Sequence, residues 1–208
     1  MFTDIKINNS EIAFFDFDGT ITSKDTLAEI LKFIKGKYNY YFGILVLAPI
    51  IALYKIGLLS NHRAKELLLI YFLKGFDANK FNALCRDFSE KRLPHLLKRG
   101  ALYEIRKHLQ RKTPVIIISA SAENWILPWC SKYNIECIAT KLEVKNGKLT
   151  GKIEGRNCSG YEKVKHMQAK YKLAEYEKIY AYGDSKDDLP MLALATEKNY
   201  KPFRKFSY

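Results

Sequence analysis

The 208-residue sequence has little of what small cross-linked domains are built from. It contains four cysteines, which are spread along the chain and form no C-x-x-C pair. That spacing argues against a zinc cluster or a disulfide framework and is typical of reduced, cytosolic thiols. With only 11 glycines and 6 prolines, collagen-like and low-complexity architectures are excluded as well.

A secretory leader and a long apolar span are also missing. Residues 1–11 are polar and contain no apolar stretch, so we expect no leader and a cytoplasmic protein. The longest run free of charge covers residues 38–54 and contains Pro49. Its length is about the lower limit for crossing a bilayer.

Acidic residues are scarce relative to basic ones. The chain has 22 Asp and Glu against 35 Lys and Arg, which gives a net charge of +13. This balance favours an anionic partner, such as nucleic acid, a phospholipid surface or a phosphorylated substrate. Because 48% of the residues are apolar, a sizeable core can form, and the length fits one domain with a modest insertion.

Short apolar runs alternate with helical patterns over much of the chain. Such alternation predicts an α/β fold with a parallel sheet and helices on both faces. The Asn146-Gly147 pair predicts a hairpin over residues 142–153. The runs expected to form buried strands are 12–15, 114–119, 135–139 and 178–182.

The helical stretch between the first two strands is too long for a simple crossover. We therefore expect residues 24–95 to form an inserted helical cap, with Asn61 capping one of its helices. Residues 1–23 and 96–208 would then form the catalytic core. Ligands of such sheets bind at the carboxyl ends of the strands.

Asp16 and Asp18 directly follow the first apolar run, and Gly19 allows a sharp turn. Two carboxylates at this spacing can share one cavity with a divalent cation, one attacking phosphorus and the other handling the leaving-group proton. The structural alternative is a polar strand end with an Asx-turn.

A second acidic cluster, Asp184, Asp187 and Asp188, follows the run 178–182. Three neighbouring carboxylates repel one another unless a cation lies among them, and hard oxygen ligands favour Mg²⁺. The alternative is a helix N-terminus enriched in aspartate. Two such clusters at strand ends favour the metal site. Ser119 and Lys163 say little when each is considered alone.

The ordered set of motifs resembles the haloacid dehalogenase superfamily, and within it the phosphoserine-phosphatase-like subfamily IB. The resemblance implies a Rossmann-like parallel sheet with a four-helix cap inserted between the first two motifs. The motifs that carry it are Asp16-Phe17-Asp18-Gly19-Thr20, Val115–Ser119, Lys163, and Gly183-Asp184-Ser185-Lys186-Asp187-Asp188.

This resemblance implies roles for individual residues. Asp16 would be the nucleophile that forms an aspartyl-phosphate, and Asp18 would protonate the leaving oxygen and then activate water. Ser119 and Lys163 would neutralise the phosphoryl oxygens. Mg²⁺ would be held by Asp16, the Asp18 carbonyl and Asp184, with Asp188 in support. The residues expected to bind substrate are Gly19, Thr20, Asp25, Arg63, Ala120 and Ser121.

The substrate expectation depends on the cap. Asp25 and Arg63 stand only near the places of the residues that grip free phosphoserine in that subfamily. Residues 38–59 combine an apolar run with tyrosines and neighbouring lysines, a pattern suited to the inner face of an anionic membrane. The cap resembles bacterial phosphatidylglycerophosphatase C, which implies a lipid phosphate. The other interpretation of this run is a buried core helix.

Other functions remain open from the sequence. One is a soluble phosphatase for a small, phosphoserine-like molecule, and another is a phosphotransferase with a second acceptor. A nucleic-acid binder is prompted only by charge, and because the lysines are dispersed we expect no nucleic-acid partner. A phosphorylated small molecule or lipid is the expected partner.

Overall fold

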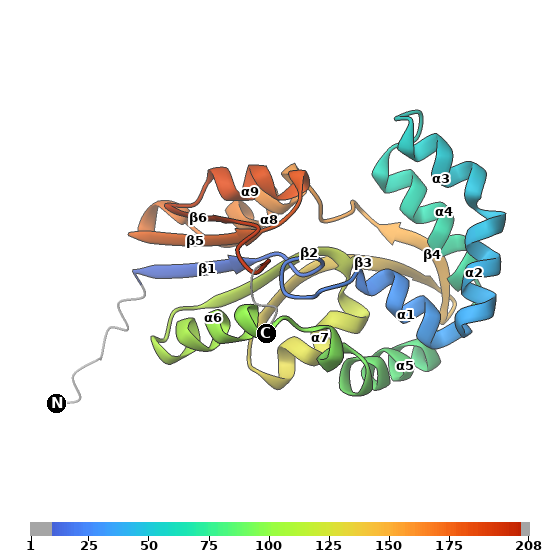
Figure 1. Cartoon of the computed structure of the whole chain (residues 1–208), viewed down its shortest axis with the longest axis horizontal. Helices are drawn as coiled ribbons and strands as arrows, with labels where there is room; N and C mark the ends of the chain where they lie inside the picture. The colour runs from blue at the N-terminus through green and yellow to red at the C-terminus, as the bar shows by residue number, and fades with distance from the viewer. Residues whose placement is uncertain (1–9, 205–208) are drawn as a thin grey trace.

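The computed structural model describes residues 10–204, in which six strands form one sheet in the order β4-β3-β2-β1-β5-β6 (Figure 1). All neighbours pair in parallel except β3 and β4, which are antiparallel. The α/β class expected from the sequence is therefore confirmed. The strands are β1 (Glu11–Phe15), β2 (Val115–Ala122), β3 (Glu136–Lys145), β4 (Lys148–Glu154), β5 (Lys178–Gly183) and β6 (Glu197–Tyr200).

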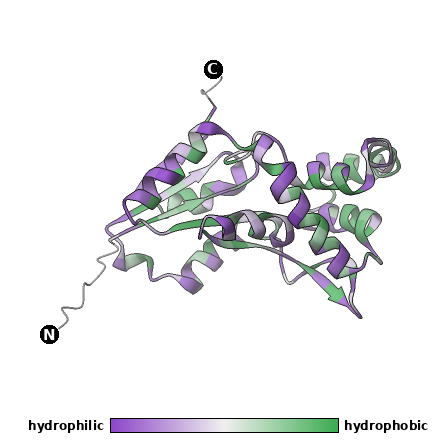
Figure 2. Ribbon diagram, turned by 90° about the horizontal axis from the view of Figure 1, so that it is seen from below, coloured by the Kyte–Doolittle hydropathy of each residue, from purple (hydrophilic) through white to green (hydrophobic). Residues whose placement is uncertain are grey.

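The central strands are buried on both faces. Along β1, Ala13 and Phe15 pack into one hydrophobic cluster, whereas Ile12 and Phe14 pack into the other. Successive side chains of a strand point to opposite faces, so a continuous apolar run is what a doubly covered strand requires. The helices, by contrast, carry hydrophobic and hydrophilic residues on the same ribbon (Figure 2).

Helices cover the two faces of the sheet as separate layers. The helices α6 (Arg99–Gln110) and α7 (Glu123–Lys132) lie on one face, and α8 (Tyr161–Lys170) and α9 (Leu189–Ala193) lie on the other (Figure 1). Three short 3-10 turns complete the described part of the chain, η1 (Leu93–Leu96), η2 (Leu173–Glu175) and η3 (Lys186–Asp188).

The segment between β1 and η1 is helical throughout its long middle part and gathers at one end of the sheet (Figure 1). It holds five α-helices rather than the four that the family resemblance implied. They are α1 (Thr26–Lys35), α2 (Lys37–Val46), α3 (Ala48–Lys55), α4 (Asn61–Leu73) and α5 (Ala78–Lys91).

The predicted hairpin carries the sheet towards these helices. It turns at Asn146 and Gly147, and β4 then packs against α4. The approach is close, because a Cβ on Gly151 would lie 2.4 Å from the backbone of Ile70. The cap of α4 is Ser60, whose hydroxyl accepts a hydrogen bond from the Arg63 N–H, so the expectation that Asn61 caps this helix was wrong.

The apolar run of residues 38–59 is broken at Leu47. Pro49 lies in the first turn of α3, where its missing N–H costs no helical hydrogen bond, so a new helix begins there. Neither half is a buried core helix, because α3 has no buried residue and α2 buries only Gly43. Within residues 10–204, no helix has the length and apolarity needed to cross a membrane.

Candidate active site

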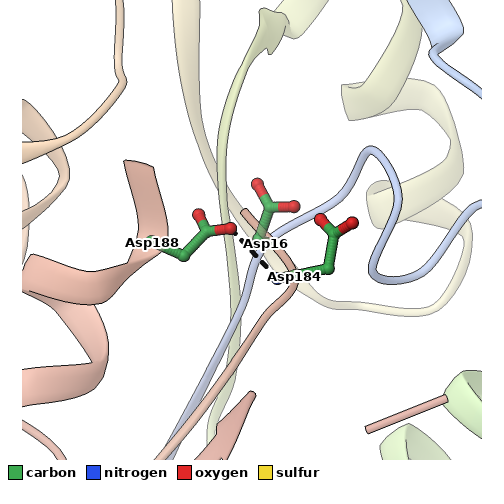
Figure 3. Close-up of side chains that lie close together, drawn as sticks. All are labelled: Asp16, Asp184 and Asp188. Atoms are coloured by element: carbon green, nitrogen blue, oxygen red, sulfur yellow. Dashed lines mark hydrogen bonds between the residues drawn. The ribbon is translucent and has the colours of Figure 1, made fainter. Parts of the chain in front are cut away.

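The site forms where β1 and β5 end side by side. These strands pair in parallel, with Phe15 opposite Tyr182, so the residues that follow them must meet. The Asp16 N–H donates to the Tyr182 carbonyl at 2.9 Å. Asp16, which follows β1, thereby converges with Asp184 and Asp188, which follow β5 (Figure 3), and each offers a carboxylate oxygen within 4.8 Å of the others.

Lys163 of α8 lies between two of these carboxylates. Its side chain is buried, and Nζ is 2.5 Å from Asp16 Oδ1 and 2.6 Å from Asp188 Oδ1. Burial alone would lower the pKa of Lys163, but the two carboxylates together raise it above its ordinary value. For Asp16 the balance is reversed: burial outweighs the attraction of Lys163 and raises the pKa to about 7.

Asp188 anchors the loop that carries Asp184. Its Oδ2 accepts hydrogen bonds from the Asp184 N–H at 3.1 Å, the Ser185 N–H at 2.9 Å and the Ser185 hydroxyl at 2.8 Å. Burial would raise the pKa of Asp188, but Lys163 and Ser185 together lower it. Asp188 therefore stays ionised and orients both Lys163 and the Asp184 loop.

Asp18 faces a different set of groups. Its Oδ1 accepts the Thr26 N–H at 2.7 Å, and its Oδ2 accepts the Ser121 hydroxyl. Burial is the main cause that raises the pKa of Asp18, and the charge of Asp25 adds to it. Ser119 is buried beside this pair, and its hydroxyl accepts the Ser121 N–H at 3.0 Å. Asp18 is thus held in one orientation and favours retaining a proton.

The three converging carboxylates fit a divalent cation. They supply only hard oxygen donors, which suit Mg²⁺. The pKa of Asp184 is raised by burial and by the charge of Asp188, so a cation would relieve their repulsion. Gly19 makes room for this group, since its φ is +79° and an added Cβ would lie 2.5 Å from Asp184 Oδ2.

Two expected substrate-binding residues sit behind the carboxylates. The Thr20 hydroxyl donates to Asp16 Oδ2 at 3.1 Å and lies 3.4 Å from Asp184 Oδ1. The Gly19 carbonyl accepts from Lys98 Nζ. Both Gly19 and Thr20 therefore lie beside the acidic cluster and are absent from the described lining of the cavity in front of it.

A cavity of about 430 Å³ opens in front of Asp16 and Asp18. One wall is polar and comes from the end of β2 and from α8, including the expected residues Ser119, Ala120, Ser121 and Lys163. Asp25 also lines it, although its carboxylate already accepts the Ala28 N–H at 2.9 Å as the cap of α1. The opposite wall is apolar and consists of Leu27, Leu47, Ile50, Ile51, Tyr54 and Leu68.

The residues of α4 that face the cavity are Asn61, Ala64, Lys65 and Leu68. Their spacing of three and four places them on one face of the helix. Arg63 lies off this face and donates to Glu66 at 3.3 Å. It does not line the cavity, contrary to the expectation that it binds substrate there. A residue two positions further on is turned by roughly 200°, which is why Lys65 lines the cavity instead.

Sequence reasoning missed Lys65 and Asn157, and it assigned Asp187 to the acidic cluster. Asp187 Oδ2 instead accepts from Ser159 at 2.5 Å and from Asn61 at 3.3 Å, which ties α4 to the core. The helical spacing of Asn61, Lys65 and Leu68 was a signal that could have indicated a shared face. Nothing in the linear pattern indicated which face it would be.

Comparisons with known proteins agree with this geometry. The family model of haloacid dehalogenase-like hydrolases matches residues 13–193. Protein CicA of Caulobacter vibrioides is 31% identical over 192 residues, which cover 91% of this chain and 85% of CicA. The chain therefore belongs to the haloacid dehalogenase-like hydrolases and is an enzyme of that family.

Solved structures show the same fold. A protein of unknown function from Bordetella pertussis Tohama I superposes with a TM-score of 0.77 at 23% identity, covering 89% of this chain and 87% of that one. A phospho-aspartyl intermediate analogue of phosphoserine phosphatase superposes with a TM-score of 0.63 at 21% identity, covering 88% and 82%.

Proposed function

We propose that this chain is a phosphatase that hydrolyses phosphate monoesters through an aspartyl-phosphate on Asp16. The observation that carries the proposal is the buried Asp16 carboxylate, held 2.5 Å from Lys163 and open to the cavity beside Asp18. A solved phosphoserine phosphatase of this fold holds a phospho-aspartyl analogue, which supports the same kind of intermediate here.

In the first step, an Asp16 carboxylate oxygen attacks phosphorus and the bond from phosphorus to the ester oxygen breaks. The ester oxygen leaves with the proton of Asp18, which Ser121 and the Thr26 N–H hold towards the cavity. Lys163 donates to the phosphoryl oxygens as their charge shifts in the transition state, and Ser119 lines the same end of the cavity.

In the second step, Asp18 takes a proton from water as the water oxygen attacks phosphorus. The bond between phosphorus and Asp16 breaks, inorganic phosphate leaves, and both aspartates return to their starting states. Asp16, Asp184 and Asp188 would hold Mg²⁺. When bound, Mg²⁺ supplies positive charge that offsets the repulsion between the carboxylates and the phosphoryl group.

The direct test is phosphate release from an aryl phosphate with Mg²⁺. We expect Asp16→Asn to abolish turnover and EDTA to do the same in the unaltered protein, because each removes a part of the reaction centre. Circular dichroism should show Asp16→Asn to be folded. Turnover by Asp16→Asn at the rate of the unaltered protein would refute the nucleophile assignment.

We further propose that residues 24–95 act as a cap over the site and that the substrate is amphiphilic, such as a lipid phosphate like phosphatidylglycerophosphate. The support is the apolar cavity wall that α3, α4 and the junction before α3 supply, including Leu47, Ile50 and Leu68. A small polar ester would leave this wall without apolar contact. A soluble, phosphoserine-like ester is the alternative, and a substrate panel that includes both distinguishes them.

The outer side of α2 and α3 supports peripheral contact with an anionic membrane. Its apolar side chains form what we call the outer cap face, and Lys37 and Lys55 are exposed beside it. Apolar and aromatic groups next to lysines suit a bilayer interface. The outer cap face consists of Tyr38, Tyr41, Phe42, Leu45, Val46, Leu53, Ile56 and Leu58, all exposed.

Co-sedimentation with vesicles tests this contact. We expect more binding to anionic than to neutral vesicles, and salt should weaken it only in part, because the apolar contribution is insensitive to screening. Val46→Asp, at a side chain 49% exposed, should reduce vesicle binding while sparing hydrolysis of a small soluble ester. Tyr103→Asp on α6 is the matched control. No binding to either vesicle type at low salt would contradict the proposal.

A further inference from the structure

The cavity contains one cation for which the proposed reaction has no use. Lys65 faces the cavity from α4, and its Nζ donates to the Ala120 carbonyl at 2.5 Å and to Asn157 Oδ1 at 3.3 Å. Both acceptors are neutral. Lys163, in contrast, lies against two carboxylates, so the two lysines of the cavity differ in kind.

Lys65 has no counter-ion within residues 10–204. Among the residues that the structure describes, no carboxylate oxygen comes within 4.0 Å of its Nζ. Burial accordingly lowers the pKa of Lys65, although the charges of Asp18 and Asp25 oppose the shift. An ammonium group away from water without an anion is unfavourable, so an anion supplied from the cavity would stabilise it.

The neutral acceptors of Lys65 are themselves fixed. The Thr140 hydroxyl lies 2.7 Å from the Ala120 carbonyl and 3.0 Å from Asn157 Oδ1, and it accepts the Cys158 N–H at 3.0 Å. This network sets the position of the ammonium before any ligand arrives. An ammonium has three N–H donors, and the two fixed acceptors leave one for a group in the cavity.

We propose that Lys65 forms a second anion subsite, which selects phosphate monoesters whose leaving group carries an anionic group of its own. The inference rests on the proposed function, because it takes the phosphoryl group to bind at Asp16. Ala120, whose carbonyl holds Lys65, directly follows Ser119, which lies by the phosphoryl group. The phosphoryl group and the second anion would therefore bind next to each other at the end of β2. The apolar wall contacts the remainder of the substrate.

A carboxylate or a phosphodiester would supply the second anion, and the test distinguishes these sources. The carboxylate arm compares O-phosphorylated ω-hydroxy acids of two to four carbons with their carboxamides. The phosphodiester arm uses glycerol bisphosphate in which one phosphate stays a monoester. The other phosphate is either an anionic methyl diester or a neutral dimethyl triester. The two members of each pair are close in size, and one carries an anionic group that is neutral in the other. The proteins are the unaltered chain, Lys65→Met, and the control Lys74→Met, which removes an exposed charge at the end of the same helix.

We expect the unaltered chain and Lys74→Met to prefer the anionic member of at least one pair by about tenfold or more in kcat/KM, as a charged hydrogen bond implies. In Lys65→Met this ratio should fall towards one. A ratio near one in the unaltered chain for every pair, or a ratio retained in Lys65→Met, would overturn the inference.

Calorimetric binding of the same pairs to Asp16→Asn separates this inference from the proposed function. Suppose that the unaltered chain hydrolyses nothing, that Asp16→Asn binds the anionic ester more tightly than the neutral one, and that adding Lys65→Met abolishes this preference. The subsite then stands and the phosphatase assignment fails. If turnover occurs without any charge preference, the assignment stands and the subsite fails.

Discussion

Replacing Lys163 tests whether the acidic cluster depends on this lysine for stability as well as for catalysis. Lys163 is buried and bonded at 2.5 and 2.6 Å to two carboxylates. In Lys163→Met, Asp16 and Asp188 would remain buried without their counter-charge. Removing one partner of a buried ion pair typically costs about 3–5 kcal/mol. For a chain of this length, 1 kcal/mol shifts the melting temperature by about 2–4 °C, so we expect a decrease of about 6–20 °C.

The pH dependence of this loss follows from the raised carboxyl pKa. The pKa of Asp16 is already about 7, above its value of about 3.9 in an unfolded chain. The folded state then binds more protons than the unfolded state between these values, so this group lowers stability as pH rises. Without Lys163 the effect should strengthen, and the destabilisation should be larger at pH 8 than at pH 5.

Thermal melts in EDTA at both pH values measure this, because EDTA removes any cation that would replace the lost charge. Lys165→Met is the matched control, since Lys165 lies two residues away on α8 with 63% of its side chain exposed. Its melting temperature should change by no more than about 2 °C. A decrease in Lys163→Met no larger than in the control at pH 8 would refute the reasoning.

Three further changes probe other parts of the molecule. Asp18→Asn should slow alkyl phosphates far more than nitrophenyl phosphate, because only the alkyl oxygen needs a proton to leave; equal losses would remove Asp18 from the acid role. Gly19→Ala should impair activity, since its Cβ would lie 2.5 Å from Asp184 Oδ2 at a φ of +79°; normal Mg²⁺-dependent turnover would contradict this. Burial lowers the pKa of His108. Below about pH 6.5 the imidazole therefore binds a proton more readily in the unfolded chain, and the free energy of unfolding decreases as the pH is lowered. In His108→Gln, urea unfolding at pH 7.5 and pH 5.5 should show a smaller decrease in the free energy of unfolding than in the unaltered protein. An unchanged pH dependence would contradict this role of His108.

Much of the fold and the acidic site followed from local sequence signals. The run ending at Phe15 had to be a buried strand because its residues are apolar on both faces. The Asn146-Gly147 pair specified a tight turn through its positive φ values. Once strands ending at Phe15 and Gly183 are parallel neighbours, Asp16 and Asp184 must meet, and the order of motifs was enough to expect it.

The cap was less predictable, because the face that a helix buries depends on what packs against it. Residues 40–54 contain no charged residue and have apolar residues on all sides, so the sequence alone could not distinguish a core helix from an exposed one. Only the tertiary structure exposes the outer cap face and turns Leu47 and Ile50 towards the cavity. The same reason separates Arg63 from Lys65. Both are cations on α4, but the position of β4 against that helix decides that Lys65 meets the cavity while Arg63 pairs with Glu66.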